Sequence, residues 1–155
     1  MVDMSVAEID TMLSEARIGR LCMANGDGRP YAIPLPFCWH NQSIYVRLAL
    51  TGRKGDILSQ NNHVCFEVDH FTDSLDSYAS VLIEGQMVPV EDLGEKSSVK
   101  RNNDEKYDRL RGGFRPGHGR NVSLQDLPMR KIIVEQIAGR MKESPTRMAT
   151  SAVIS

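Results

Sequence analysis

The stretch Gly28-Arg29-Pro30-Tyr31-Ala32-Ile33-Pro34-Leu35-Pro36-Phe37 alternates like a β-strand, yet it carries prolines at positions 34 and 36. Proline has no amide hydrogen to donate to a neighbouring strand, so a strand with this sequence belongs at the edge of a sheet. Two interpretations follow. The prolines protect an ordinary edge strand against aggregation, or the sheet opens here and the freed backbone of Ile33, Leu35 and Phe37 faces a planar ligand.

Short apolar segments with turn residues between them surround this stretch. Asn25-Gly26-Asp27-Gly28 joins it to the preceding segment as a hairpin, and a capping box at Ser5 to Glu8 predicts a helix over 5–16. A second short helix follows Thr51, and 91–110 is polar and compatible with a helix. Strands are predicted at 18–24, 31–37, 44–48, 63–68, 78–85 and 129–137. The fold class expected is mainly β with flanking helices, as an antiparallel meander or barrel.

Length and composition restrict the class of protein. A chain of 155 residues, 41% hydrophobic and 25% charged, can form one core, which we place at 1–143 with a C-terminal tail at 144–155. No apolar run approaches the roughly 20 residues of a membrane span. The first ten residues hold no basic residue or apolar segment typical of a targeting signal, so we expect a soluble, cytoplasmic protein with no membrane partner.

The cysteines and histidines do not have the spacing of a metal site. The three cysteines are odd in number and lack a C-x-x-C motif, so we expect reduced, structural thiols. The histidines are dispersed, and we predict no metal. These residues are Cys22, Cys38 and Cys65, and His40, His63, His70 and His118.

Charge is distributed unevenly along the chain. The net charge of −1 excludes a strongly polyanion-seeking protein, but 1–92 carries −7 and 93–155 carries +6. The basic half either mixes with the acidic half on one folded surface, or it lines an anion site or meets a second subunit. The Gly- and Arg-rich segment 111–120 resembles a nucleic-acid-binding segment, but it is a single short copy. We therefore expect a loop over a cleft and no nucleic acid.

Thr51-Gly52-Arg53-Lys54 opens the second helix and is the best candidate for an anion site. Thr51 can cap the helix, Gly52 permits close backbone approach, and the helix N-terminus offers unpaired N–H groups beside two cations. This combination suits a phosphate monoester. The alternative is a solvated basic turn.

Taken in order, these blocks resemble the pyridoxamine 5′-phosphate oxidase-like FMN-binding split-barrel superfamily, and within it the nitroimidazole-resistance (NimA-like) group. The resemblance covers residues 5 to about 92, and 131–142 resembles the final strand of the family. It implies an antiparallel split β-barrel and a homodimer that binds FMN in two clefts between subunits. Val46-Arg47 stand where the NimA-like group has a histidine, so nitroreduction is not carried over.

The resemblance also implies a set of cofactor-binding residues. Backbone contacts to the flavin ring are implied for Ile33, Pro34, Leu35, Pro36, Phe37 and Cys38, with Arg47 and Leu48 beside the cofactor. Arg53 and Lys54, with Thr51 and Gly52, would hold the phosphate, and Ser80 would place a polar side chain on the flavin. No catalytic side chain is assigned.

Two hypotheses for function follow. The first is an FMN-dependent oxidoreductase that acts on a small-molecule substrate, with the protein supplying position and electrostatics. The second is a non-catalytic module that keeps FMN, or another planar anionic cofactor such as a tetrapyrrole or deazaflavin, for sensing or storage. An RNA-binding barrel is a third hypothesis.

Overall fold

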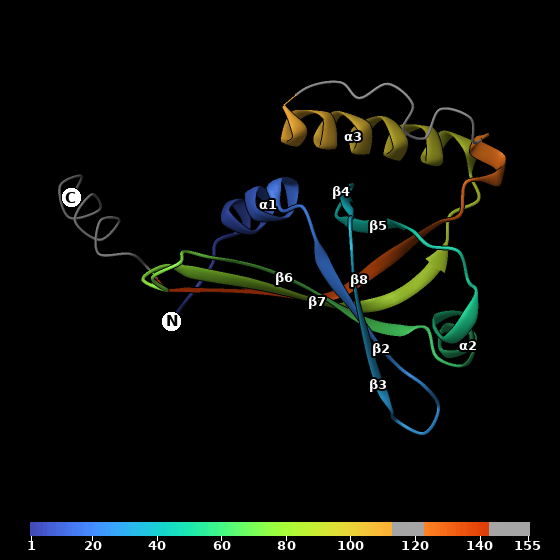
Figure 1. Ribbon diagram of the computed structural model, residues 1–155, viewed down its shortest axis with the longest axis horizontal. Coiled ribbons are helices and arrows are strands. Elements are labelled where there is room, and N and C mark those ends of the chain that lie inside the picture. The colour runs from blue at the N-terminus through green and yellow to red at the C-terminus, as the bar shows by residue number, and fades with distance from the viewer. Residues whose placement is uncertain (113–122, 143–155) are drawn as a thin grey trace.

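The computed structural model describes residues 1–112 and 123–142 (Figure 1). The predicted tail at 144–155 and most of the predicted loop at 111–120 lie outside the described residues.

Eight strands and three α-helices follow one another along the described chain. The N-terminal half contains β1 (Val2–Asp3), α1 (Val6–Glu15), β2 (Gly19–Ala24), β3 (Pro30–Leu35), β4 (Cys38–His40), β5 (Ser43–Arg47) and α2 (Gly52–Gln60). It is followed by β6 (His63–Phe71), β7 (Tyr78–Pro89), α3 (Leu93–Arg111), a 3₁₀ turn (Leu124–Asp126) and β8 (Met129–Lys142).

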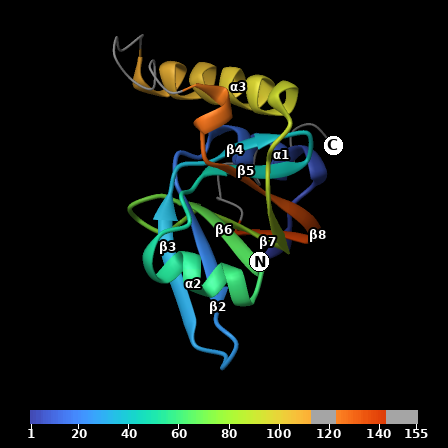
Figure 2. The same cartoon turned by 90° about the vertical axis from the view of Figure 1, so that its right-hand side faces the viewer.

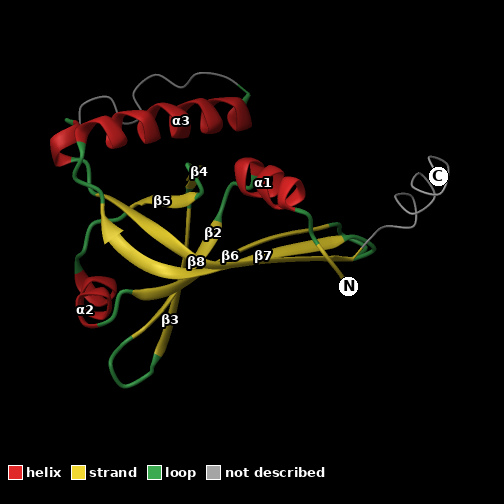
Figure 3. Cartoon of the chain, turned by 180° about the vertical axis from the view of Figure 1, so that it is seen from behind, coloured by secondary structure: helices red, strands yellow, loops and turns green. Residues whose placement is uncertain are grey.

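The strands form one antiparallel sheet in the order β3-β2-β6-β7-β8-β5-β4, with β1 paired to β8. Although β3 and β4 are consecutive in sequence, they lie at opposite ends of this order. The sheet therefore curls and remains open between them (Figures 1 and 3). This arrangement confirms the predicted split-barrel fold class.

Pro34 determines which backbone groups of β3 pair with β2. It lies opposite Arg20 but has no N–H, so this must be a pair that exchanges no hydrogen bonds. The flanking residues Ile33 and Leu35 then bond to Leu21 and Gly19. The outer edge of β3 carries the backbone groups of the alternate residues.

The core lies on the inner face of the curled sheet. Burial alternates along the strands, and α1 closes this face with Leu13, which is fully buried. The rings of Phe37 and Phe66, both buried, meet edge to face with their centroids 5.1 Å apart. Each such buried side chain contributes roughly 1.5–3 kcal/mol.

The helix α3 lies across β4 and β5, whereas α2 lies at the other end of the sheet beside β2 (Figures 1 and 2). Polar anchors hold α3 in place. Glu95 accepts hydrogen bonds from Tyr45 Oη at 2.6 Å and from Lys131 Nζ at 2.7 Å. The bond from Lys131 holds the pKa of Glu95 below its usual value. No described helix is long and apolar enough to span a bilayer.

Some elements differ from the prediction. The strand predicted at 31–37 ends at Leu35, and the chain re-enters the sheet as the short strand β4. β7 and β8 are longer than predicted, and β8 has an irregularity opposite Gly85 that the hydrophobic pattern does not show. A Cβ at Gly85 would collide with the Ile133 carbonyl oxygen, so this position requires glycine.

Candidate functional site

The first turn of α2 leaves its N–H groups without a side-chain cap. Thr51 is the N-cap residue, yet its side chain makes no capping hydrogen bond. Gly52 has a φ of +64°, and no atom lies within 4 Å of where its Cβ would be. An open space thus adjoins uncapped backbone donors, which is the arrangement of an anion-binding helix terminus.

Arg53 joins this helix terminus to the proline-containing strand. Its guanidinium lies over the ring of Tyr31 on β3, 4.6 Å from the centroid. Stacking occupies the face of the guanidinium and leaves its N–H groups available to an anion. Among the described residues, neither Arg53 nor Lys54 forms an ion pair with a carboxylate.

The outer edge of β3 is exposed and unpaired with any described strand. Because Ile33 and Leu35 bond to β2, the outer edge carries the Ala32 N–H and C=O and the Pro34 carbonyl. The sequence predicts free backbone groups at Ile33 and Leu35, but the register with β2 places those of the alternate residues on the open edge. The side chains of Pro34 and Pro36 are exposed, whereas that of Leu35 is buried.

The peptide groups of Phe37 are already engaged by α3. Its N–H donates to Tyr107 Oη at 3.0 Å, and its carbonyl accepts from Lys106 Nζ at 3.0 Å and from Tyr107 Oη at 2.9 Å. The Lys106 ammonium also lies 4.0 Å from the centroid of the Phe37 ring. Phe37 therefore has no backbone group free for a ligand, contrary to the sequence argument.

The side chains of three further predicted cofactor-binding residues lie away from the β3 edge. Cys38 and Leu48 are buried, and burial raises the pKa of the Cys38 thiol to about 11. Arg47 is exposed and forms an ion pair of 3.7 Å with Asp104 on α3. These side chains lie in or against the body of the protein rather than at the β3 edge.

Ser80 is remote from the helix terminus within one chain. It lies opposite Asp69 on β6 and Arg140 on β8. Tyr31 shares a row of the sheet with Gly85, five residues from Ser80 along β7. From the usual rise per residue and the usual spacing of strands, Ser80 and Tyr31 are separated by about 16 Å along the strands and about 14 Å across them. One chain does not bring Ser80 to a ligand held by Arg53.

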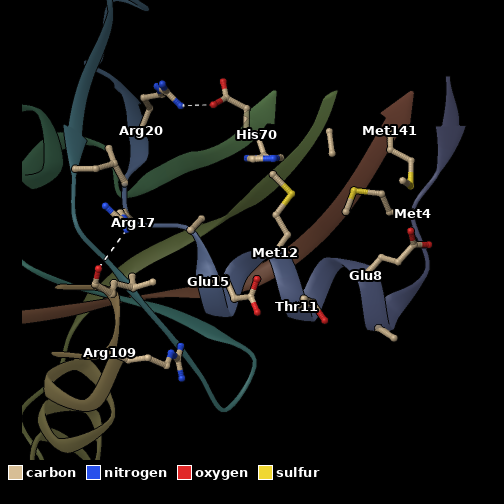
Figure 4. Close-up of a pocket in the computed structure, with 16 residues that line it drawn as sticks. Met4, Glu8, Thr11, Met12, Glu15, Arg17, Arg20, His70, Arg109 and Met141 are labelled. Atoms are coloured by element: carbon tan, nitrogen blue, oxygen red, sulfur yellow. Dashed lines mark hydrogen bonds and ion pairs between the residues drawn. The ribbon is translucent and has the colours of Figure 1, made fainter. Parts of the chain in front are cut away.

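A separate cavity of about 960 Å³ lies between α1 and the strands (Figure 4). It contains none of the predicted cofactor residues. Figure 4 shows arginines at one end and methionines along the rest of it, namely Arg17, Arg20 and Arg109, and Met4, Met12 and Met141. Two of the arginines are engaged, because Arg17 donates to the Leu110 carbonyl and Arg20 contacts two carboxylates.

Within residues 1–112 and 123–142, no three His, Cys, Asp or Glu side chains gather as metal ligands do.

The family model described as pyridoxamine 5′-phosphate oxidase matches residues 5–140. The chain belongs to this family. The match extends from α1 through β7 and α3 to nearly all of β8, and only the short strand β1 lies wholly outside it among the described elements. No curated protein matches the chain significantly.

Solved structures share the fold of this pyridoxamine 5′-phosphate oxidase family member. A protein assigned to 5-nitroimidazole antibiotic resistance from Bacteroides thetaiotaomicron has a TM-score of 0.70 and 20% identity, over 90% of this chain and 86% of its own. An FAD-binding protein from Mesorhizobium loti has a TM-score of 0.67 and 23% identity, over 92% and 98%. The heme storage protein HutZ from Vibrio cholerae has a TM-score of 0.61 and 18% identity, over 85% and 92%.

Sequence reasoning missed Tyr31, Lys106 and Tyr107. Tyr107 is the one aromatic residue in the polar stretch 91–110, and this could have marked it as a buried contact of the helix. No local signal connects Lys106 to Phe37, because 69 positions separate them.

The buried ammonium of Lys106 gives a pH-dependent prediction. Burial lowers the pKa of Lys106 to about 8, so between pH 8 and 10 the unfolded chain binds more protons than the folded one. Stability relative to Lys106→Met should therefore rise with pH in this window, by roughly 1–3 kcal/mol. Urea unfolding at both pH values measures this, with Lys100→Met as the control for removing a lysine from α3. A constant difference between wild type and Lys106→Met would contradict it.

Proposed function

We propose that the protein binds FMN at the β3 edge and the α2 N-terminus, and acts as an oxidoreductase on a small molecule. The observation that carries the proposal is the stacking of Arg53 on Tyr31. It joins an uncapped helix terminus with two cations to an open strand edge, in a chain that belongs to the pyridoxamine 5′-phosphate oxidase family.

The phosphate end of FMN fits the residues present. Its two negative charges would meet Arg53, Lys54 and the first N–H groups of α2, and Thr51 has a hydroxyl not used for capping. The open space at Gly52 leaves room for phosphate oxygens near the backbone. Each charge-assisted hydrogen bond contributes about 1.5–3 kcal/mol.

The flavin ring of FMN fits the outer edge of β3. A flavin presents both hydrogen-bond donors and acceptors on its pyrimidine ring, and Ala32 offers an N–H and a C=O on the open edge. When bound, the flavin supplies the hydride chemistry. The residues of the chain bind and orient it, and the backbone donor stabilises negative charge on the ring.

We further propose that the protein is a homodimer and that the second copy completes the site. The candidate edge is exposed in one chain, whereas cofactor sites enclose most of the surface of their ligand. Ser80 cannot reach a ligand at Arg53 within one chain, but a second copy can present its own Ser80 there.

The proposal is specific to FMN, although heme-binding proteins share this fold. Arg53 and Lys54 at a helix terminus match a phosphate monoester better than the carboxylates of a heme. The alternative remains a module that holds FMN without turnover.

The phosphate clamp predicts a preference for FMN over riboflavin. Arg53→Ala should weaken FMN binding by roughly ten- to a hundred-fold, because a charge-assisted pair is lost, and should leave riboflavin binding almost unchanged. Fluorescence titration measures both affinities. Arg101→Ala, which removes an exposed arginine from α3, is the matched control. Equal affinity of the wild-type protein for FMN and riboflavin would show that the turn is only a basic surface.

If each site is built from both subunits, FMN binding should recover in mixed dimers of two defective variants. Ser80→Trp should block one side of the cleft and Arg53→Ala should remove the other, so each variant alone binds FMN poorly. When the two are co-expressed, a mixed dimer contains one site with both changes and one with neither, and about half of its binding capacity should return. Sedimentation should give twice the mass of the 17.3 kDa chain. A monomer with bound FMN, or no recovery in purified mixed dimers, would contradict the proposal.

Turnover distinguishes the oxidoreductase from the storage module. Anaerobic addition of NADH or NADPH should bleach the bound flavin, and an added electron acceptor should restore its colour. Absorbance followed by stopped flow measures both steps, with free FMN as the control. A flavin that never bleaches with either nucleotide would support the module.

A further inference from the structure

Two of the three cysteines lie directly opposite each other in the sheet. Cys22 on β2 pairs with Cys65 on β6, and both are half-buried. The third cysteine, Cys38, is buried on β4 at the end of the sheet order. The facing pair is not visible in the sequence, where 43 positions separate its members.

The spacing of the two backbones permits a covalent bond between the thiols. Since Pro34 directs Ile33 and Leu35 toward β2, the backbone groups of Cys22 turn the other way, toward β6. The pair Cys22 and Cys65 is then of the hydrogen-bonded kind, with Cα atoms about 5.5 Å apart, within the 4.4–6.8 Å typical of disulfides. The Cβ atoms must approach by roughly 1–2 Å, and a disulfide under such strain is easily reduced.

A small molecule can reach both thiols. A cavity of about 680 Å³ opens over this part of the sheet, and its lining includes both cysteines together with His63, Glu84 and Glu135. This volume lies in the range of small-molecule sites. Burial, the neighbouring Cys22 thiol and Glu84 raise the pKa of Cys65 to about 11. Attack by the Cys65 thiolate should therefore speed up about tenfold per pH unit below that value.

We propose that Cys22 and Cys65 form a reversible oxidation site that closes to an intramolecular disulfide with a low-molecular-weight disulfide such as oxidised glutathione. One thiolate attacks a glutathione sulfur, breaks its disulfide and releases one glutathione thiolate. The second thiolate then attacks the protein sulfur of the mixed disulfide and releases the other. The two cysteines lose two electrons and two protons, which end on two molecules of reduced glutathione.

The bond would link β2 to β6 and enclose all the chain between them. That loop includes β3, β4, β5 and α2. The inference does not depend on the proposed cofactor, because it concerns only the two thiols and the cavity above them.

The test treats the full-length protein with oxidised glutathione, then unfolds it in acid, alkylates it with N-ethylmaleimide and measures the intact mass. Wild type should lose two hydrogen atoms and carry one label, and dithiothreitol should restore three labels. The reaction should accelerate as the pH is raised. Cys38→Ser is the matched control and should form the same disulfide with no label remaining. Cys22→Ser and Cys65→Ser should each stop at the mixed disulfide with glutathione or remain fully labelled.

Three labels on wild type, or a wild-type mixed disulfide that persists without closing, would overturn the proposal. A doubled mass from bonding between two molecules, or an intramolecular disulfide in Cys22→Ser, would overturn it as well.

Discussion

Pro34 has no amide hydrogen, and this missing donor determines which backbone groups of β3 and β2 face each other and which face away. Because Pro34 cannot bond to Arg20, Ile33 and Leu35 must bond to β2, which leaves Ala32 and the Pro34 carbonyl on the open edge. The same alternation continues through β2 and turns the backbone of Cys22 toward Cys65. The open edge and the facing thiols thus have a common origin.

The sheet is open between β3 and β4, and α3 stabilises the short segment of chain that connects these two strands. Lys106 and Tyr107 bond to both backbone groups of Phe37, at the point where the chain leaves one end of the sheet and enters the other. Burying an ammonium is costly, and here a carbonyl and the face of the Phe37 ring offset part of that cost. The helix therefore fixes the strand that carries the candidate edge.

Local patterns predicted much of this structure, and the failures concern long-range contacts. The capping box at Ser5, the edge strand with Pro34 and the cations at the start of α2 are all local, and the structure contains each of them. The engagement of Phe37 by α3 and the distance of Ser80 depend on packing across the sheet, which no short motif encodes. One interpretation of the charge imbalance was a mixing of the acidic and basic halves on one folded surface, but among the described ion pairs only Asp3 with Arg140 joins an acid of the first half to a base of the second.

The central claim is that the uncapped α2 terminus and the β3 edge together hold a flavin mononucleotide. The visible absorption spectrum of freshly purified protein, combined with chromatography of the ligand released by denaturation, tests this most directly. The predicted result is the pair of visible bands of oxidised flavin, with FMN as the released compound. A heme Soret band, or a colourless protein that takes up no flavin when incubated with FMN, would contradict it.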